Sequence, residues 1–572
     1  MSPTKAEHYL QSLIAGALQR LGWLHPPSFG SDELGGGAAL DVAIERPKQE
    51  SFGDYATPMA MTLARDLRKA PRLIAQELVA ALQYDKAMIS EISIDGPGFI
   101  NFRLGPGYWQ AQLAAILKER EAFGKSTWGE GRKLQVEFVS ANPTGPLNVV
   151  SARAASVGDV LVSLFQAVGF DAAREYYVND AGRQVRLLGE SVSARYMALF
   201  NQPEPFPEEG YHGDYIIELA REIHEQHGDR LVTLAKEERA NRLSELALER
   251  MVKAHQDILA RFRVQYDLWF RESSLRGSNR QQEVLELFSQ KDLSYEKAGA
   301  LWFSSSQFGD EKDRVLITSA GEPTYFLVDI AYHLDKYRRG FAMIYDLWGP
   351  DHHGYIARMK AALAALGLPA GSFEIRIIQQ VNLLRAGEPV KMSKRAGNII
   401  EMAEVLDDVG VDAARFFFLM RKLDSPLDFD LELAKKQTDE NPVYYVQYAH
   451  ARICSILAYA RTQLAQSQSV TPQKTEDNAN LSRLNAAEEI MLIKKLVEFP
   501  EVISKAAQFL EPNRLTNYLQ ELAASFHRFY HEHRVVSDDH VLTSARLRLV
   551  EATRIVLSNA LRLLNISAPE KM

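Results

Sequence analysis

Two loops of the sequence carry the groups best suited to binding phosphate. Residues 141–146 lie between an alternating apolar segment, which predicts a strand, and an apolar pattern with helical spacing. A loop in that position offers free backbone N–H groups and the positive end of a helix dipole, and both favour an anion. The second loop places Lys391, Lys394 and Arg395 within a glycine-bounded stretch. Cations beside an α/β crevice suit a polyphosphate, whereas an ordinary βα unit and a solvated charged loop are the alternatives.

A third set of reactive side chains lies on one predicted helix. Tyr325, Asp329 and His333 are spaced four residues apart and therefore share a face. Apolar residues flank Asp329, and a carboxylate in such surroundings needs a cationic partner. The adjacent His352 and His353 point in different directions, which favours contact with a ligand at a helix start over a paired metal site.

Three other motifs do not support a functional site. The segment Gly124-Lys125-Ser126 resembles the end of a phosphate-binding P-loop, but the required earlier glycine is Glu119. His224 and His227 lack the spacing of a zinc-binding helix and are expected on a solvated face. The single cysteine, Cys454, excludes a disulfide framework and a four-cysteine zinc site, and its apolar helical surroundings are typical of a buried, inert thiol.

Length and patterning predict several domains. A chain of 572 residues is too long for one core, so roughly three to four domains are expected. We place a small α+β domain at 1–125, an α/β domain at 126–435 with a charged helical insertion near 201–300, and a helical bundle at 436–572.

The first two domains should contain both helices and strands. In the first we expect helices at 9–21 and within 52–65, the latter capped by Asp54, and strands at 40–44, 91–95 and 99–102. In the second we expect strands at 134–138, 315–317 and 343–345, a helix that ends at Gly169, and a helix at 323–337.

The last part of the chain should be helical from about residue 410 to the end. Helices are expected at 441–460, 487–499 and 545–566, with a polar loop at 463–480. Such a bundle can bind RNA through stacking and phosphate contacts, or serve only for packing.

Charge and hydropathy limit the classes of function. The net charge of −8 argues weakly against a nucleic-acid partner, although residues 441–572 carry a small excess of Lys and Arg, where a phosphate-rich partner would meet the least repulsion. No stretch of 18 consecutive apolar residues and no signal peptide occur, so we expect no membrane span and a cytoplasmic protein.

Six motifs resemble one family over essentially the whole chain: VEFVSANPTGPL, YYVNDAGRQ, GPDHHGYI, VNLLRAGEPVKMSKRAGN, NPVYYVQYAHARI and LRLLNISAPEKM. They are similar to the bacterial arginyl-tRNA synthetases, which are class I aminoacyl-tRNA synthetases. The resemblance implies a Rossmann-type α/β catalytic core, an amino-terminal α+β domain that touches the tRNA elbow, and an all-α anticodon-binding domain. It also implies ATP-dependent formation of arginyl-adenylate from L-arginine, then transfer of arginine to tRNA(Arg).

The resemblance also assigns residues to each substrate. The positions implied to contact arginine are Glu137, Asn142, Asn179, Gln184, Tyr325 and Asp329. Those implied to bind ATP are Asn148, Val150, Ser151, Gly349, Asp351, His352, Lys391, Met392 and Lys394. Asp329 would be the main counter-charge of the guanidinium group. Lys391 and Lys394 would be catalytic, because they would stabilise the α-phosphate and the departing pyrophosphate. Mg²⁺ is expected to accompany ATP rather than to occupy a dedicated protein site.

One motif departs from the family pattern. Where the family usually has His-x-Gly-His, this chain has Asn148-Val149-Val150-Ser151. Asn148 and Ser151 can still donate hydrogen bonds, but with shorter reach than histidine and without positive charge. Val150 adds a branched side chain where glycine would let adenine pack against the backbone.

Three interpretations follow from this departure. The chain is a working arginyl-tRNA synthetase with a variant ATP loop, a catalytically impaired tRNA-binding protein on the same scaffold, or a synthetase for another amino acid. The intact Glu137, Asn142 and Asp329 and the complete Lys391–Lys394 loop favour the first, and the carboxylates favour a cationic substrate over the third. The resemblance further indicates a monomer.

Overall fold

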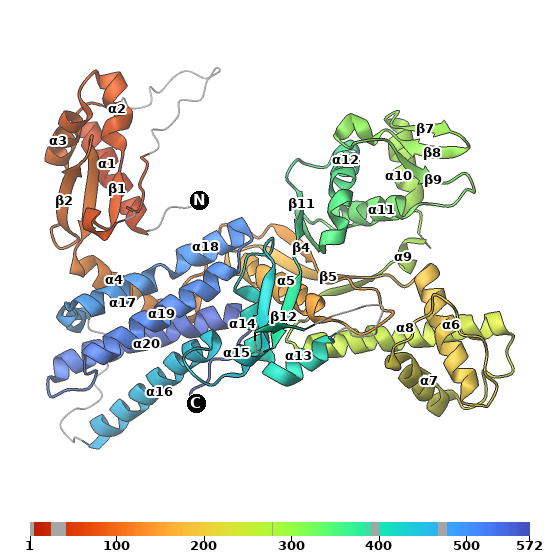
Figure 1. Ribbon diagram of the computed structural model, residues 1–572. Coiled ribbons are helices and arrows are strands. Elements are labelled where there is room, and N and C mark those ends of the chain that lie inside the picture. Colours follow the sequence, from red (N-terminus) through yellow and green to blue (C-terminus); the bar gives the residue numbers. More distant parts are fainter. Residues whose placement is uncertain are drawn as a thin grey trace.

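The computed structural model describes residues 5–23, 42–47, 49–276, 278–385, 387–390, 400–466 and 478–572. In Figure 1 the amino-terminal domain and the lobe that contains α10, α11 and α12 stand on opposite sides of the molecule. The central sheet and the helical bundle occupy the region between and below them.

The amino-terminal domain packs helices on a small antiparallel sheet. Its sheet has the order β1 (Tyr55–Thr57), β3 (Phe99–Leu104), β2 (Ile89–Asp95). Its helices are α1 (Lys5–Arg20), α2 (Met59–Leu67) and α3 (Pro71–Ala81). The predicted first helix and the two later strands are confirmed. From this domain, α4 (Pro106–Glu119) runs on to pack against the bundle helices α17 and α20.

Two predictions for this domain are wrong. Asp54 does not cap a helix, because α2 begins only at Met59, after Pro58. The Asp54 carboxylate instead accepts hydrogen bonds from the Leu104 N–H at 2.8 Å and from the Lys494 ammonium group of the bundle. The predicted strand at 40–44 lies partly outside the described residues, and its described part, 42–44, forms no strand.

A parallel sheet of five strands forms the centre of the molecule. Its order is β11 (Phe373–Ile377), β10 (Met343–Trp348), β4 (Lys133–Glu137), β5 (Asp171–Val178), β6 (Leu268–Arg271). The chain passes from β4 outward to β6 on one side, then returns to β10 and β11 on the other. Strand order therefore reverses between β4 and β10, and in such sheets ligands bind at the carboxyl ends of the strands beside that reversal.

Helix α5 (Val149–Ala167) follows β4 and packs closely against the sheet. A Cβ atom on Gly158 would lie 2.1 Å from the Phe138 ring, so the close approach of helix and strand requires glycine there. Gly169, at φ 93°, ends the helix as the sequence indicates. In the described part of the chain α5 is the one helix long and apolar enough to cross a membrane, and 72% of that window is buried inside the protein, as in a core helix.

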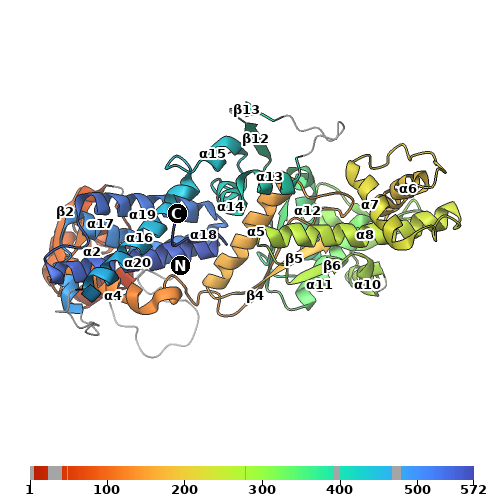
Figure 2. The ribbon, with the colours of Figure 1, turned by 90° about the horizontal axis from the view of Figure 1, so that it is seen from below.

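A helical segment interrupts the sheet between β5 and β6. It comprises α6 (Arg183–Ala198), α7 (Asp214–His227) and α8 (Lys236–Arg261). These helices share a hydrophobic core that includes Leu188, Ile216 and Leu243. Figure 2 shows α8 extending from the sheet region out to α6 and α7. Because β6 rejoins the central sheet, residues 268–271 belong to the α/β domain rather than to the helical segment.

A separate lobe lies between β6 and β10. It contains α9 (Ser273–Arg276), α10 (Arg280–Gln290), β7 (Ser294–Lys297), β8 (Ala300–Phe303), β9 (Arg314–Ile317) and α11 (Tyr325–Arg338), and α12 (Ile356–Leu366) packs with them. The predicted strands at 315–317 and 343–345 and the helix at 323–337 are confirmed. The first of these strands belongs to the antiparallel β7–β8–β9 sheet of the lobe, not to the central sheet.

The prediction that the chain is helical from about residue 410 to the end is wrong in one place. Strand β14 (Leu427–Asp430) pairs in parallel with β12 (Val381–Arg385), which also pairs with β13 (Glu388–Pro389). The short LDFD sequence of β14 has buried Leu427 and Phe429, alternating with polar residues at the edge of this small sheet. The neighbouring helices are α13 (Met402–Val409), α14 (Val411–Leu419) and α15 (Leu431–Lys435).

The carboxyl-terminal part is a helical bundle, as predicted. Its helices are α16 (Pro442–Gln466), α17 (Ala487–Val497), α18 (Phe499–Phe509), α19 (Asn513–Glu532) and α20 (His540–Leu563). Helices α18 and α19 had no predicted bounds of their own but lie within the part of the chain that was expected to be helical. Cys454 on α16 is half-buried, and burial raises the pKa of its thiol, in agreement with an unreactive side chain.

Candidate active site

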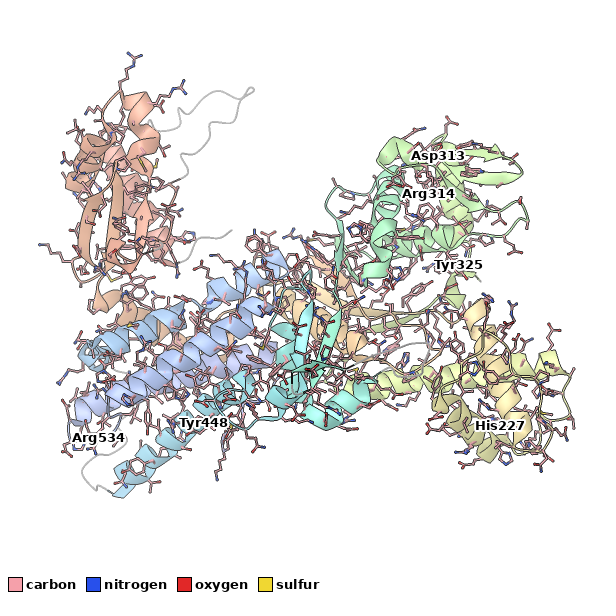
Figure 3. The ribbon with its side chains drawn as sticks, viewed as in Figure 1. His227, Asp313, Arg314, Tyr325, Tyr448 and Arg534 are labelled. Atoms are coloured by element: carbon pink, nitrogen blue, oxygen red, sulfur yellow. The ribbon has the colours of Figure 1, made fainter. Side chains whose placement is uncertain are left out.

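A cleft of about 530 Å³ opens at the carboxyl ends of β4, β5 and β10, beside the point where strand order reverses. Seven of the residues predicted for the site line it: Glu137, Asn142, Asn179, Tyr325, Asp329, Gly349 and His352. They come from the strand ends, the loops that follow them, and helix α11 of the lobe. Figure 3 labels Tyr325 at the lower edge of that lobe in this view, and its side chain is 64% exposed.

Asp329 is a partly buried carboxylate that lines the cleft. Its carboxylate accepts a hydrogen bond from the Tyr355 hydroxyl at 2.6 Å, and none of the ion pairs found between described residues includes it. Burial raises the pKa of Asp329 to about 6, although the Tyr355 hydrogen bond and the nearby His333 act in the opposite direction. A bound cation would reverse this shift, because it would stabilise the ionised carboxylate.

Glu137, in contrast, already has a cationic partner. Its carboxylate accepts hydrogen bonds from the buried Lys336 ammonium at 2.6 Å, from the Tyr332 hydroxyl at 2.9 Å and from Ser140 at 2.9 Å. Lys336 also donates to Asp346 at 2.9 Å. Burial alone would lower the pKa of Lys336, but Asp346 and Glu137 outweigh it, so the ammonium group stays charged. Glu137 is therefore held in place, and its charge balanced, by side chains of the protein itself.

The same network continues beneath the cleft. Asp346 at the end of β10 accepts a hydrogen bond from His333 at 2.7 Å, and His333 also contacts the backbone oxygen of Asp329 at 2.7 Å. The Tyr332 hydroxyl shares its single proton between Glu137 and Glu175, which lies 2.7 Å away, and Arg339 donates two hydrogen bonds to Glu175. Helix α11 is thus bound to β4, β5 and β10 by hydrogen-bonded charges, which fixes the position of Asp329 over the strand ends.

A residue that the sequence reasoning missed, Glu272, also lines the cleft. It directly follows β6, is 2% exposed, and lies beside Tyr177, whose pKa is raised by burial and by the Glu272 charge. With its amide nitrogen turned toward Glu272, Asn179 donates to that carboxylate at 3.1 Å. Glu272 escaped notice because the surrounding residues read as part of a charged insertion. Its position after a short aromatic strand was the available signal.

Five of the predicted residues that the structure describes lie apart from the cleft lining: Gln184, Asp351, and Asn148, Val150 and Ser151 at the start of α5. Gln184, at the start of α6, is exposed but accepts a hydrogen bond from the Asn142 side chain at 2.6 Å, so it contacts the site through Asn142. Asp351 is exposed on the 3₁₀ turn Pro350–Tyr355 that follows β10.

The four residues that depart from the family pattern form the start of α5. Asn148 is the amino-terminal cap: its side-chain oxygen accepts hydrogen bonds from the Val150 and Ser151 N–H groups, each at 3.0 Å. The Ser151 hydroxyl donates to the same oxygen at 3.3 Å. Val150 is partly buried against the main hydrophobic core. The first turn of the helix is therefore satisfied by its own side chains rather than left open.

The predicted phosphate-binding loop contains the sequence Lys391-Met392-Ser393-Lys394, and we call it the KMSK loop. The segment after this loop runs beside the start of α5. Val149 N–H donates to Ile400 O at 3.3 Å, and Met402 N–H donates to Leu147 O at 2.8 Å. The predicted ATP-binding and catalytic residues Lys391, Met392 and Lys394 lie outside the described residues. The described segment that follows them, residues 400–402, is therefore hydrogen-bonded to the residues on both sides of Asn148.

Arg153 joins the same helix to strand β12. It is fully buried and donates to four backbone carbonyls, those of Gln379, Gln380, Lys422 and Ser425, at 2.8–3.3 Å. Burial lowers the pKa of Arg153 to about 10, which still leaves it charged at neutral pH. The start of α5 and the strand that precedes residues 391–399 therefore form one hydrogen-bonded unit.

The arrangement suits a cationic ligand. Binding of that ligand does not depend on a metal ion coordinated by protein side chains. Four carboxylates line the cleft, Glu137, Glu272, Asp329 and Asp346, of which Glu137 and Asp346 share the Lys336 ammonium group. Within the described ranges no group of three His, Cys, Asp or Glu side chains is placed to hold a metal ion. His224 and His227 on α7, the latter labelled in Figure 3, accordingly form no such group.

A second hollow, of about 1000 Å³, lies in the bundle between α16, the end of α19 and the chain terminus. Its walls carry tyrosine and cationic side chains. Tyr459 is 56% exposed, and Arg452 stacks over the rings of Tyr448 and Tyr530, with its guanidinium carbon 4.6 and 5.3 Å from their centroids. Figure 3 labels Tyr448 on α16 and Arg534, another lining residue, at the far end of the bundle. Exposed rings and guanidinium groups in one hollow suit unstacked nucleotides.

Comparison with known families covers almost the whole chain. Residues 8–104 match the arginyl tRNA synthetase N terminal domain, residues 112–422 match the catalytic domain of tRNA synthetases class I (R), and residues 446–572 match the DALR anticodon binding domain. The catalytic match alone spans more than half of the chain.

Individual relatives agree with these matches. The chain is 46% identical over 533 residues to arginine–tRNA ligase 1 of Halalkalibacterium halodurans, which covers 93% of this chain and 94% of the relative. It is 47% identical over 533 residues to the arginine–tRNA ligase of Geobacillus kaustophilus, with the same two coverages. The solved arginyl-tRNA synthetase of Thermus thermophilus, at 24% identity, shares the fold with a TM-score of 0.72 over 99% of this chain and all of that one.

Proposed function

The chain belongs to the arginyl-tRNA synthetase family and is an arginine–tRNA ligase of class I, and we propose how its cleft carries out that reaction. The alternative of a non-catalytic tRNA-binding protein is not favoured, because the similarity to arginine–tRNA ligases extends through the whole catalytic domain. Asp329 is the single observation that carries the assignment of arginine to this cleft. It is a buried carboxylate with a raised pKa and a cleft in front of it.

We propose that Asp329 and Glu272 hold the guanidinium group of arginine. A planar guanidinium presents five donors in a fork, and two carboxylates on separate elements can accept from both of its edges. Tyr325 would cover the cleft from α11. Glu137, already held by Lys336 and Tyr332, would accept from the remainder of the amino acid together with Asn142, with Asn179 and Gln184 beside them.

We propose that ATP binds next to arginine, between the start of α5 and the loop after β10. The residues assigned to it there are Asn148, Val150, Ser151, Gly349, Asp351 and His352, with Lys391, Met392 and Lys394 from the predicted KMSK loop. The arginine carboxylate would attack the α-phosphorus, and the bond from that phosphorus to the pyrophosphate oxygen would break. Lys391 and Lys394 would stabilise the charge that develops.

Magnesium would be bound mainly by the phosphates of ATP. Few side chains near the proposed ATP site could coordinate a metal ion. Asp351 is an exposed carboxylate, and among the described residues it belongs to no group of three side chains that could hold a metal ion. This fits an ion that keeps several waters and arrives with its nucleotide. Its chemistry there would be to offset phosphate charge.

Transfer of arginine would then require the 3′ end of tRNA(Arg). A terminal ribose hydroxyl would attack the carbonyl carbon of the adenylate, and AMP would leave. We propose that the hollow lined by Tyr459, Tyr530 and Arg452 receives anticodon nucleotides, and that the amino-terminal domain contacts the tRNA elbow. We further propose that the enzyme acts as a cytoplasmic monomer, with domain limits near residues 125 and 435.

The assignment of arginine can be tested with its neutral isostere. ATP–pyrophosphate exchange, measured with tRNA(Arg) present, should be supported by arginine and not by citrulline, which has the same shape but no charge. Lysine should also fail, because an ammonium group cannot bridge Asp329 and Glu272 in the same geometry. Equal exchange with arginine and citrulline would show that the two carboxylates do not recognise the substrate.

A further inference from the structure

The loop between β4 and α5 has an unusual backbone. Val139 and Ser140 adopt φ angles of 69° and 39°, in the left-handed region that L residues seldom occupy. A β-branched residue such as Val139 is especially disfavoured there, because its side chain crowds the backbone. Both residues line the cleft. Such a conformation persists only when the surrounding structure holds it in place.

Four side chains supply that restraint by binding backbone oxygens on both sides of the strained residues. The contacts are Tyr266 hydroxyl to Phe138 O at 3.0 Å, Tyr176 hydroxyl to Ala141 O at 2.9 Å, Tyr215 hydroxyl to Thr144 O at 2.7 Å, and His255 Nε2 to Gly145 O at 2.8 Å. We call this set the carbonyl clamp. Every donor is an aromatic side chain, and all of them come from the part of the chain that runs from β5 to β6, which includes α7 and α8.

His255 has a defined protonation state in this clamp. A carbonyl oxygen can only accept, so Nε2 must carry the proton that it donates to Gly145 O. Nδ1 faces the Tyr176 hydroxyl at 3.1 Å. Burial lowers the pKa of His255, which favours the neutral ring with its proton on Nε2; the Tyr176 hydroxyl then shares its single proton between Ala141 O and Nδ1.

Tyr215 and His255 belong to α7 and α8, the helices that stand outside the central sheet. Neither residue lines the cleft. Gly145 is matched to Tyr215, because a Cβ atom there would lie only 3.2 Å from the tyrosine hydroxyl oxygen. The helical segment thus reaches the active-site loop through two side chains, at the end of the loop that leads into Asn148 and α5.

We propose that Tyr215 and His255 are positioning residues for arginine activation, by which the helical segment of α7 and α8 fixes the loop that carries Asn142 and leads into the ATP-binding start of α5. This proposal rests on the proposed function, since it concerns the rate of that reaction. Release of the clamp lets the strained loop relax, which moves Asn142 away from arginine and the start of α5 away from ATP.

The test compares single-group variants in ATP–pyrophosphate exchange with tRNA(Arg) present. Tyr215→Phe removes one hydroxyl and leaves the ring. His255→Leu removes the donor, whereas His255→Gln keeps an N–H donor at the end of a side chain of similar reach. Tyr518→Phe is the matched control, because its buried hydroxyl donates to the Lys495 carbonyl inside the bundle at 3.0 Å. Thermal unfolding is measured on all four variants.

Tyr215→Phe should lower kcat/KM for arginine by about 3- to 10-fold, the effect of one lost hydrogen bond. His255→Leu should lower it more, and His255→Gln should lie between His255→Leu and the wild type. Tyr518→Phe should lose a similar amount of thermal stability and keep its kcat/KM. Wild-type exchange with unchanged kcat/KM in Tyr215→Phe and His255→Leu would overturn the proposal and leave the function intact, as would a loss of kcat/KM in Tyr518→Phe equal to that in Tyr215→Phe. Absence of exchange in the wild type would refute the function itself.

Discussion

Replacing Asp329 with asparagine should make the protein more stable and a poorer enzyme. Burial raises the pKa of Asp329 from 3.8 to about 6, and each pKa unit corresponds to about 1.4 kcal/mol. Keeping this carboxylate ionised in the empty cleft therefore costs at most about 3 kcal/mol of folding free energy, less where cleft water screens it. Asparagine retains the shape and the acceptor for Tyr355 but cannot ionise.

The sign of the effect depends on pH. The folded-state pKa lies above the unfolded value, so the penalty is absent below about pH 4, where the carboxyl group is protonated in both states. It grows between about pH 4 and 6 and is complete above. Asp329→Asn should thus be more stable than the wild type by about 1–3 kcal/mol at pH 8, and equally stable near pH 4.

The same change should weaken arginine binding strongly. Loss of one partner from a desolvated charge pair costs about 2–5 kcal/mol, so the KM for arginine should rise by at least about 30-fold. In the wild type, the KM should also rise as the pH falls through about 6, because protonation removes the counter-charge.

The assays are urea unfolding at pH 8 and near pH 4, and ATP–pyrophosphate exchange at varied arginine. Asp313→Asn is the matched control in the same lobe (Figure 3). Hydrogen bonds from Ser306 and Tyr295 lower the pKa of Asp313, so its ionised form stabilises the fold at high pH, and its replacement should destabilise at pH 8. If Asp329→Asn were less stable than the wild type at pH 8, or kept its KM for arginine, the reasoning would be refuted.

Two further variants test the tRNA hollow and the unusual ATP loop. Tyr459→Ala should raise the KM for tRNA(Arg) by about 10-fold, the effect of one lost base stack, with the KM for arginine unchanged at saturating tRNA; unaltered tRNA binding in a filter assay would exclude the hollow as a binding site. The combined change of Asn148→His, Val150→Gly and Ser151→His should lower stability by roughly 1–2 kcal/mol, because it removes the cap of α5 and adds glycine to its first turn. The exchange rate of this triple variant should not rise, and a tenfold gain would mean that the natural loop is a damaged ATP site.

Local patterns predicted the elements that carry the site. The alternation around Val136 and the helical spacing around Asp329 gave β4 and α11. The sequence also indicated that Asp329 needs a cationic partner, and the ion pairs between described residues supply none. These features depend on residues close in sequence. Length and patterning gave the three domains, whereas the Rossmann-type core followed from the family resemblance, because motif spacing alone did not specify the order of strands.

The pairings between distant segments could not be predicted. Lys336 looked like an ordinary helical residue, and only folding brings it against Glu137 and Asp346. Glu272 was missed because four residues of β6 are too few to show a period. The same limit applies to β14, where pairing with β12 overrides the helical pattern on both sides.

The predicted roles of polar side chains near helix starts were wrong or incomplete where the side chain can form more than one kind of contact. Asp54 precedes a helix and could cap it, yet it binds the Leu104 N–H and Lys494 across the domain interface. Asn148 was considered only as a donor to ATP, whereas its oxygen caps α5. In both cases the choice is made by backbone geometry and by partners from remote segments.

The most direct test of the central claim is single-turnover aminoacylation by the unmodified chain. Preincubated enzyme, ATP with Mg²⁺ and labelled arginine are mixed with tRNA(Arg), and arginyl-tRNA is quantified over time. We predict charging that depends on both ATP and arginine and proceeds well above background, despite the Asn148-Val149-Val150-Ser151 sequence. Retained tRNA binding with no charging above background would contradict the account and identify a synthetase-like protein that binds tRNA without acting on it.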